Sequence, residues 1–354
     1  MIKILHSADW HLDSPMLRHT PEQAKRLRQS LQSIPMLLAE ACKNEKCDLV
    51  LLSGDLFDGD YAADTLAIVK KALETMAVPV FISPGNHDYV GEESPWLRET
   101  WPDNVHIFTH PAMEAVDVPE LDCCVYGAGF IGENCMGLLQ DFTPHHTERY
   151  AVGVLHGDPT QTDSPYCPIT RQQVAASGLD YLALGHIHKG GFFRGGKTLC
   201  AWPGCPMGRG YDEVGEKGYY MVTVDSTVTT RFVPLALPRF FDLTVTSDAS
   251  LSSLLPPVGN DDFYRITLTG PWEKPELSAI KKAFPQFPNL TLRDETVPPT
   301  QLWGTAEQDT FEGMYFKLLR DAMEEESEEA SRRQILLAAQ LSRQLLDGQE
   351  VVLP

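Results

Sequence analysis

The sequence lacks the features that mark several classes of protein. No run of 18 apolar residues occurs among its 354 residues, so we expect neither a membrane-spanning helix nor a membrane partner. The apolar stretch at residues 2–5 is too short for a signal peptide, which favours a cytoplasmic protein. None of the eight cysteines forms a CxxC pair. A zinc ribbon and a disulfide framework are therefore not expected, and the thiols are predicted to be reduced and buried.

Positive charge is also scarce. The chain carries 29 Lys and Arg residues against 49 Asp and Glu residues, a formal net charge of -20. Binding nucleic acid by bulk electrostatics needs basic side chains that displace counterions from the phosphates. Any role on nucleic acid would therefore depend on bound metal, on a local basic strip or on a partner protein.

The first 235 residues alternate short apolar runs with amphipathic stretches, which predicts βα units. Helices are expected at 21–42 and 62–76. Strands are expected at 2–5, 48–53, 78–83, 105–108, 123–126, 150–155, 181–184, 197–201, 218–225 and 228–233. Less helical sequence separates the later strands, so we expect these to form antiparallel hairpins. Together these features predict an α/β fold with two packed sheets flanked by helices.

The pattern changes after residue 235. Residues 236–300 are predicted to follow the order strand, helix, strand, helix, strand, which is typical of a small α+β domain. Residues 301–354, after Pro298 and Pro299, are predicted to be a helical tail with apolar stripes on two amphipathic helices.

Five short polar motifs follow predicted strands of the first domain. They are Asp9-Trp-His11, Gly54-Asp55, Gly85-Asn86-His87-Asp88, His156-Gly157 and Gly185-His186-Ile-His188. The carboxyl ends of strands in an open α/β layer face one crevice, so all five loops can converge there. This mixture of oxygen and nitrogen ligands suits manganese, iron or zinc better than calcium or magnesium.

The spacing within the motifs supports a metal site. Residues i and i+2 of an extended segment point to the same side, so both side chains of Asp9-x-His11 and of His186-x-His188 can reach one ion. Two adjacent ions need a shared ligand, and the carboxylate of Asp55 can bridge where a neutral imidazole cannot. Each motif alone is usually structural, since a lone Gly-Asp is most often a turn. Their order within 180 residues favours the metal site.

The motifs resemble those of the calcineurin-like metallophosphoesterase superfamily, and more closely the SbcD-type DNA repair exonucleases of the YhaO-like branch. The resemblance rests on the motifs above and on residues 4–15, 51–58, 203–210 and 216–218. It implies a two-sheet β-sandwich flanked by helices over residues 1–235, a small capping domain over 236–300 and a tail over 301–354 that docks on a partner.

The resemblance also implies roles for single residues. It assigns one divalent metal ion to Asp9, His11, Asp55 and His188, and a second to Asp55, Asn86, His156 and His186, with Mn²⁺ favoured over Fe²⁺ or Zn²⁺. His87 would protonate the leaving oxygen, and Asp88 would orient His87. Some family members carry a second histidine shortly after the Gly-Asp motif, and Asp58 stands at the comparable place here. Arg209 could contact a substrate phosphate or be a plain loop residue.

Three functions remain open at this point. The first is a DNA exo- or endonuclease subunit that uses a two-metal-activated water and works with an SbcC-like coiled-coil ATPase. It would dimerise through the helices at 21–43 and 62–76. The second is a phosphodiesterase or phosphatase on a small molecule or a protein. The third is a non-catalytic scaffold on the same fold, against which the full set of polar ligands argues.

Overall fold

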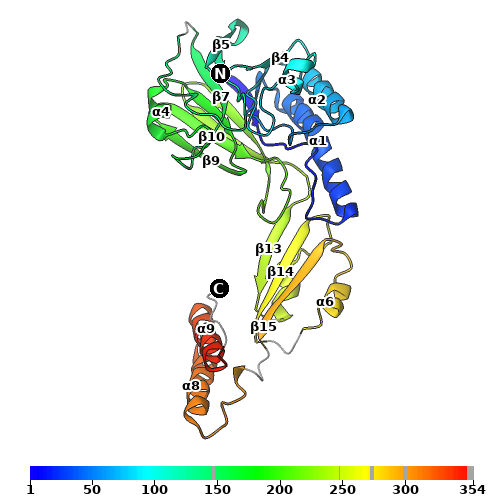
Figure 1. Ribbon diagram of the computed structural model, residues 1–354, viewed down its shortest axis with the longest axis vertical. Coiled ribbons are helices and arrows are strands. Elements are labelled where there is room, and N and C mark those ends of the chain that lie inside the picture. Colours follow the sequence, from blue (N-terminus) through cyan, green and yellow to red (C-terminus); the bar gives the residue numbers. More distant parts are fainter. Residues whose placement is uncertain (146–147, 247, 272–274, 298–301, 349–354) are drawn as a thin grey trace. The chain divides into compact units, whose positions relative to one another are not determined.

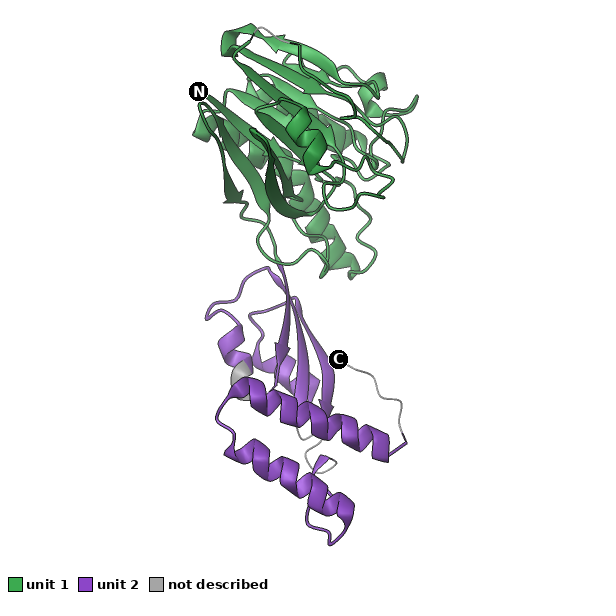
Figure 2. Ribbon diagram, turned by 90° about the vertical axis from the view of Figure 1, so that its left-hand side faces the viewer, with its two compact units in different colours: residues 1–239 green, residues 240–354 purple. Residues whose placement is uncertain are grey.

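The computed structural model describes residues 1–145, 148–246, 248–271, 275–297 and 302–348. The chain divides into two compact units, residues 1–239 and 240–354 (Figure 2). Among the described helices, none is both long and apolar enough to cross a membrane. The predicted boundary between the capping domain and the helical tail, at residues 300 and 301, lies outside the described residues, so the predicted subdivision of the second unit stays a prediction.

The first sheet of unit 1 is mainly parallel. Its strands lie in the order β12 (Val228–Pro234), β11 (Gly218–Val224), β1 (Ile2–Ser7), β2 (Leu49–Leu52), β3 (Val80–Ile82) and β4 (Val105–Ile107). The four strands β1 to β4 are parallel to one another, whereas β11 pairs antiparallel with both β1 and β12. The carboxyl ends of β1, β2 and β3 therefore share one edge of the sheet.

The second sheet has the order β5 (Glu114–Val118), β6 (Cys123–Gly127), β7 (Tyr150–His156), β8 (Tyr181–Gly185), β10 (Thr198–Gly204) and β9 (Lys189–Gly195). Here the prediction of antiparallel hairpins is only partly right. The pairs β9–β10 and β11–β12 are antiparallel, but β6, β7, β8 and β10 run parallel to one another. The connections between these parallel strands are largely irregular, with the short helix α4 (Arg171–Ala176) before β8, so they lack the long helical pattern of a βα unit.

The two sheets pack face to face around one apolar core. Alternate residues of β1 and β2, such as Ile4 and Leu51, are buried in one cluster with Val152 and Val154 of β7. Intervening residues such as Val50 are also buried, because side chains alternate across a strand and the opposite face is covered by helices. The predicted two-sheet sandwich flanked by helices is confirmed (Figure 1).

Two long helices lie beside each other on unit 1, α1 (Pro21–Glu45) and α2 (Ala63–Met76) (Figure 1). The sequence starts α1 with a capping box, in which Thr20 accepts from the backbone of Gln23 and the Gln23 side chain accepts from the backbone of Thr20. The buried face of α1 carries Leu27, Leu31, Ile34 and Leu38, at helical spacing. The shorter elements of this unit are α3 (Pro95–Arg98) and the 3₁₀ turn η1 (Pro119–Leu121).

Unit 2 contains a parallel three-stranded sheet and a helical pair. The sheet follows the predicted order, with β13 (Phe240–Val245), α5 (Asp248–Leu254), β14 (Phe263–Pro271), α6 (Leu277–Ala283) and β15 (Leu290–Val297). The predicted tail helices are α8 (Phe311–Glu325) and α9 (Glu329–Leu346). They share a small core that includes the fully buried Phe316 and Ala339.

Candidate metal centre

All seven predicted ligands lie together at the carboxyl ends of five strands. Sheet one contributes the loops after β1, β2 and β3, and sheet two contributes the end of β7 and the turn after β8. The contacts between these ligands form one connected group: Asp9, His11, Asp55, Asn86, His156, His186 and His188. The sandwich thus unites side chains that are separated by up to 179 residues.

The backbone bends sharply where the ligands are placed. Asp9, His11 and Asp55 adopt left-handed conformations with φ of 55°, 46° and 52°, which non-glycine residues rarely adopt. Gly54 before Asp55 has φ of 85°, and a Cβ there would lie 2.7 Å from His156 Nδ1. Such strained residues concentrate at functional sites, where the surrounding structure holds them.

The first group of ligands is centred on Asp9, His11 and His188, which each offer an atom within 4.8 Å of the others. The Nε2 atoms of His11 and His188 are 3.0 Å apart. Two ring nitrogens at this distance need a proton or a metal ion between them, because their lone pairs repel. Asp9 Oδ1 accepts from the backbone of His186 at 2.9 Å, but the buried Oδ2 has no hydrogen-bond partner among the described residues.

The second group lies beside the first and shares Asp55 with it. Asp55 Oδ2 is 3.4 Å from Nε2 of His156 and 3.8 Å from Nε2 of His11, so it lies between the two groups. Asn86 Oδ1 is 3.0 Å from Nε2 of His156 and 3.2 Å from Nδ1 of His186. This is the arrangement that a bridging carboxylate and a neutral amide ligand require.

The outer nitrogens of three histidines are already engaged. Nδ1 of His11 bonds Asp58 at 3.0 Å, Nδ1 of His156 bonds the Ser53 carbonyl at 2.8 Å, and Nδ1 of His188 bonds Glu213 at 2.6 Å. Metal-bound histidines usually donate their other ring N–H to a partner of this kind, so these contacts fit rings that would present Nε2 to an ion.

The donor set fits divalent metal ions. Burial lowers the pKa of His11, and burial with the neighbouring His156 lowers the pKa of His186 to about 4, so both rings are neutral as ligands must be. The unpartnered oxygen of Asp9 and the facing nitrogens of His11 and His188 leave lone pairs that a cation would satisfy. Carboxylate, amide and imidazole together favour Mn²⁺, Fe²⁺ or Zn²⁺.

His87 stands at the exposed side of this centre. Its side chain is 46% exposed, and its Nδ1 is 2.9 Å from Asp58 Oδ1, the same oxygen that accepts from His11. The hydrogen bond to Asp58 raises the pKa of His87, against the opposing effect of burial. His87 can therefore carry a proton near neutral pH and present it to solvent or substrate.

The prediction that Asp88 orients His87 is wrong. The Asp88 carboxylate turns away and accepts from the backbone N–H groups of Gly85 at 2.8 Å, Leu56 at 2.7 Å and Asp55 at 3.1 Å. It holds together the two loops that carry Asp55 and His87. Asp58, which stands where some family members have a histidine, is the partner of His87 instead.

The sequence reasoning also missed Glu213, whose carboxylate contacts His188 and Arg209. Its position in the sequence could have indicated a role, because Glu213 lies between residues 203–210 and 216–218, two of the stretches on which the family resemblance rests. Arg209 is bound to Glu213 and its side chain is only 20% exposed, so it is more than a plain loop residue.

A cleft of about 800 Å³ adjoins His87. It is lined mainly by polar residues from the segments after β2 and β3, among them Asp60, Tyr61, Tyr89, Glu92 and Glu93. The acidic character of this cleft matches the charge of the whole chain and disfavours a polyanion on this side of the centre.

Comparisons with known proteins found sequence relatives, structural neighbours and a matching family model. The metallophosphoesterase YhaO of Bacillus subtilis is 33% identical over 241 residues, which are 63% of this chain and 57% of YhaO, so the match spans less than two thirds of that protein. The SbcD subunit of the SbcCD nuclease of Staphylococcus epidermidis is 22% identical over 270 residues, 66% of this chain and 70% of that protein. A dimetal phosphatase structure from Danio rerio is 14% identical with a TM-score of 0.45, covering 65% of this chain and 98% of that one. Residues 2–190, more than half of the chain, match the model of the calcineurin-like phosphoesterases, and the chain belongs to this family.

Proposed function

We propose that the protein is a metal-dependent phosphodiesterase, and that its substrate is DNA. The observation that carries the proposal is the convergence of ring nitrogens of His11, His156 and His188 on Asp55 and on the unpartnered oxygen of Asp9. Asp9, His11, Asp55 and His188 would hold one ion, and Asp55, Asn86, His156 and His186 the other. When bound, two such ions acidify a water, neutralise the phosphate and stabilise the attacking and leaving oxygens. Mn²⁺ is the ion we expect.

In this proposal His87 donates the proton to the leaving oxygen. Asp58 fixes the ring by its bond to Nδ1, which directs Nε2 away from Asp58. The same bond stabilises the protonated ring, so that the donor is charged when a diester is bound. General acids of this kind contribute about 10²–10⁴ in rate.

The proposal of a DNA substrate rests on the similarity to the SbcD nuclease. The net charge of -20 opposes the binding of DNA, so a source of positive charge is needed. We propose that a coiled-coil ATPase resembling SbcC supplies the basic surface for DNA. The helix α8 offers a docking stripe, since Phe311, Met314 and Leu318 share one face at helical spacing and are 84%, 55% and 70% exposed. Its acidic neighbours Glu324, Glu325 and Glu326 would steer it towards a basic partner.

The docking proposal is tested with a double variant, Phe311→Glu with Leu318→Glu. It should lose co-purification with the ATPase while hydrolysis of a small diester is unchanged. Leu345→Glu with Leu346→Glu is the matched control, because these α9 residues are equally apolar and 66% and 56% exposed. Undiminished binding by the α8 variant would refute this docking surface.

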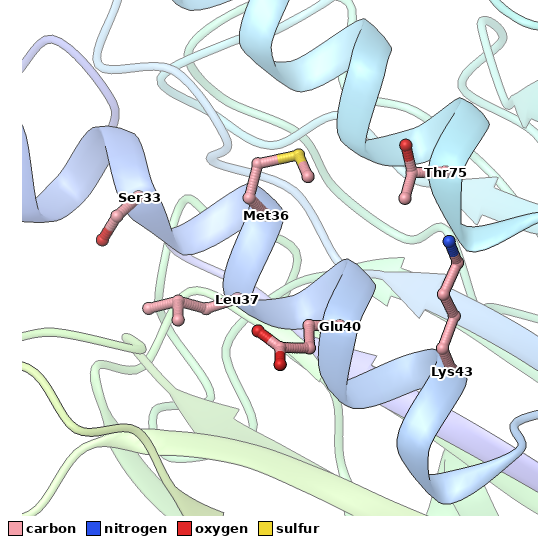
Figure 3. Close-up of a pocket in the computed structure, with 6 residues that line it drawn as sticks. All are labelled: Ser33, Met36, Leu37, Glu40, Lys43 and Thr75. Carbon is pink, nitrogen blue, oxygen red and sulfur yellow. The ribbon is translucent and has the colours of Figure 1, made fainter.

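We further propose a cytoplasmic homodimer. The location is supported by eight cysteines that lie buried as free thiols. The dimer would use α1 and α2, between which a groove of about 320 Å³ is lined by Met36, Leu37 and Lys43 of α1 and Thr75 of α2 (Figure 3). Light scattering should give a dimer for the wild type and a monomer for Met36→Lys. Met136→Lys, at a residue that is 64% exposed elsewhere on unit 1, should remain a dimer.

A second candidate function, a phosphodiesterase or phosphatase on a small molecule or a protein, is favoured by the acidic cleft beside His87. The deciding experiment compares Mn²⁺-dependent cleavage of linear DNA with hydrolysis of bis-p-nitrophenyl phosphate, with and without the ATPase. Cleavage of DNA that increases with the ATPase supports the nuclease. Hydrolysis of the small diester without cleavage of DNA, both with and without the ATPase, supports the second candidate. Inactivity on both substrates favours the non-catalytic scaffold.

A further inference from the structure

The loop between β10 and β11 holds His188 from both its backbone and its side chain. Lys217 Nζ donates to the carbonyl of His188 at 3.0 Å, and the backbone N–H of Cys205 donates to the same carbonyl at 3.3 Å. Glu213 Oε1 accepts from Nδ1 of the His188 ring at 2.6 Å. This loop therefore fixes both the position and the orientation of a residue that belongs to a different strand end.

Glu213 is itself held by Arg209. The backbone N–H of Arg209 donates to Glu213 Oε2 at 2.7 Å, and its guanidinium Nη2 donates to Glu213 Oε1 at 3.0 Å. The Glu213 side chain is 8% exposed, and a buried carboxylate is stable only when such partners compensate its lost hydration. Although burial opposes ionisation, the bonds with His188 and Arg209 hold the pKa of Glu213 well below its ordinary value.

Arg209 also connects the two halves of the first ligand group. Its Nη1 is 3.8 Å from Asp58 Oδ1, and its carbonyl accepts from Nε2 of His19 at 2.8 Å. Asp58 bonds the outer nitrogen of His11, and Glu213 bonds the outer nitrogen of His188. The Arg209 guanidinium thus lies between the carboxylates of Asp58 and Glu213. The histidines that these carboxylates bind have their Nε2 atoms 3.0 Å apart.

We propose that Glu213 is a positioning residue for the ion bound by Asp9, His11 and His188, and that Arg209 locks it in place. Glu213 keeps His188 in the form that carries its proton on Nδ1, so that Nε2 faces the ion. Arg209 keeps Glu213 and Asp58 at a fixed separation and thereby sets the distance between the two ring nitrogens. The proposal rests on the proposed two-metal function, and it adds to that function a residue outside the ligand set.

The test measures ion affinity rather than activity alone. Mn²⁺ is titrated calorimetrically into the metal-free full-length wild type, Glu213→Ala, Glu213→Gln and Glu216→Ala. Loss of the carboxylate should weaken one of two ions by about 10–100-fold and leave the other unchanged, as is typical for partners of metal-bound histidines. Gln keeps an oxygen for Nδ1–H, so Glu213→Gln should recover most of the affinity. Glu216 belongs to the same loop but is 63% exposed and pairs with Arg239, which makes Glu216→Ala the matched control.

A second measurement is independent of ions. Long-range ¹H–¹⁵N spectra of the histidine rings in metal-free protein should show His188 protonated on Nδ1 in the wild type and in Glu213→Gln, but not fixed in Glu213→Ala. The proposal is overturned if Glu213→Ala leaves this ring signal unchanged, or if it weakens both ions equally while the thermal midpoint falls. A wild type that binds two ions but hydrolyses no diester refutes the proposed function alone. A wild type that binds no ion refutes both the function and the role of Glu213 in ion binding.

Discussion

Replacing Asp58 with alanine removes one oxygen that accepts from two imidazole rings. The two donors differ in their access to water, because the His11 ring is fully buried and the His87 ring is 46% exposed. Water can replace the carboxylate at His87 but not at His11. A buried donor left without a partner costs about 1–3 kcal/mol, so the metal-free Asp58→Ala variant should be destabilised by that amount. For a unit of the size of residues 1–239, the thermal midpoint falls by roughly 2–4 °C per kcal/mol.

The Asp58→Ala variant should also have a lower kcat, for a reason that is independent of its stability. Without Asp58 the His87 ring rotates freely and its protonated form loses a stabilising charge, which should remove much of the ~10²–10⁴ attributed to a general acid. The assay is the kcat for bis-p-nitrophenyl phosphate at saturating Mn²⁺, with calorimetric scans in parallel. Asp60→Ala is the control, since this exposed carboxylate lies two residues away. In the His87→Ala background, Asp58→Ala should lower kcat little further. Unchanged kcat in the single variant would refute the link between Asp58 and His87.

Four further outcomes are expected. Asp55→Asn should abolish activity and binding of both ions together in calorimetric titration, because the oxygen between His11 and His156 loses its charge; retention of both ions would contradict a bridging role. His87→Ala should keep both ions while kcat falls about 10²–10⁴-fold, and an emptied site by metal analysis would make His87 a ligand instead. Gly85→Ala should lose ion binding, since its Cβ would overlap Asp55 Oδ1 and lie 2.8 Å from His156 Nδ1, whereas Gly132→Ala, with open space around it, should match the wild type. Thr20→Ala should lower the free energy of unfolding by about 1 kcal/mol without changing kcat, and a loss larger than about 2 kcal/mol would show that more than the cap is removed.

Most of the first sheet could be predicted because its strands and helices are long and periodic. The helix predicted over 21–42 extends from Pro21 to Glu45, and the strands at β1 and β2 differ from expectation by two residues or fewer at each end. The strands β5 and β9 were missed. They are edge strands with exposed residues on alternate positions and, in β9, three glycines among seven residues, so hydrophobic periodicity is weak there.

The convergence of the predicted ligands could be expected from the topology, whereas the hydrogen-bond partners of these residues could not. Parallel strands end at one edge, so residues that follow them are neighbours whatever the loops do. The direction of a single side chain is not fixed in this way. Asp88 is adjacent to His87 in sequence, yet its carboxylate accepts from four backbone amides, and Asp58 reaches His87 from another loop. Glu213 is 25 residues from His188, beyond the hairpin of β9 and β10 and within the loop that follows it, and no periodic pattern relates the two residues.

The seven ligands are divided between two sheets that share no strand among the described residues. Asp9, His11, Asp55 and Asn86 follow strands of one sheet, and the three remaining histidines belong to the other. A divalent ion held by these side chains would therefore cross-link the two sheets of the sandwich. An ion present at about 100 times its dissociation constant adds about 2.7 kcal/mol to the free energy of unfolding of the folded state that binds it. Movement of one sheet against the other would pull such a site apart, so removal of the ions by a chelator should lower the free energy of unfolding of the whole sandwich.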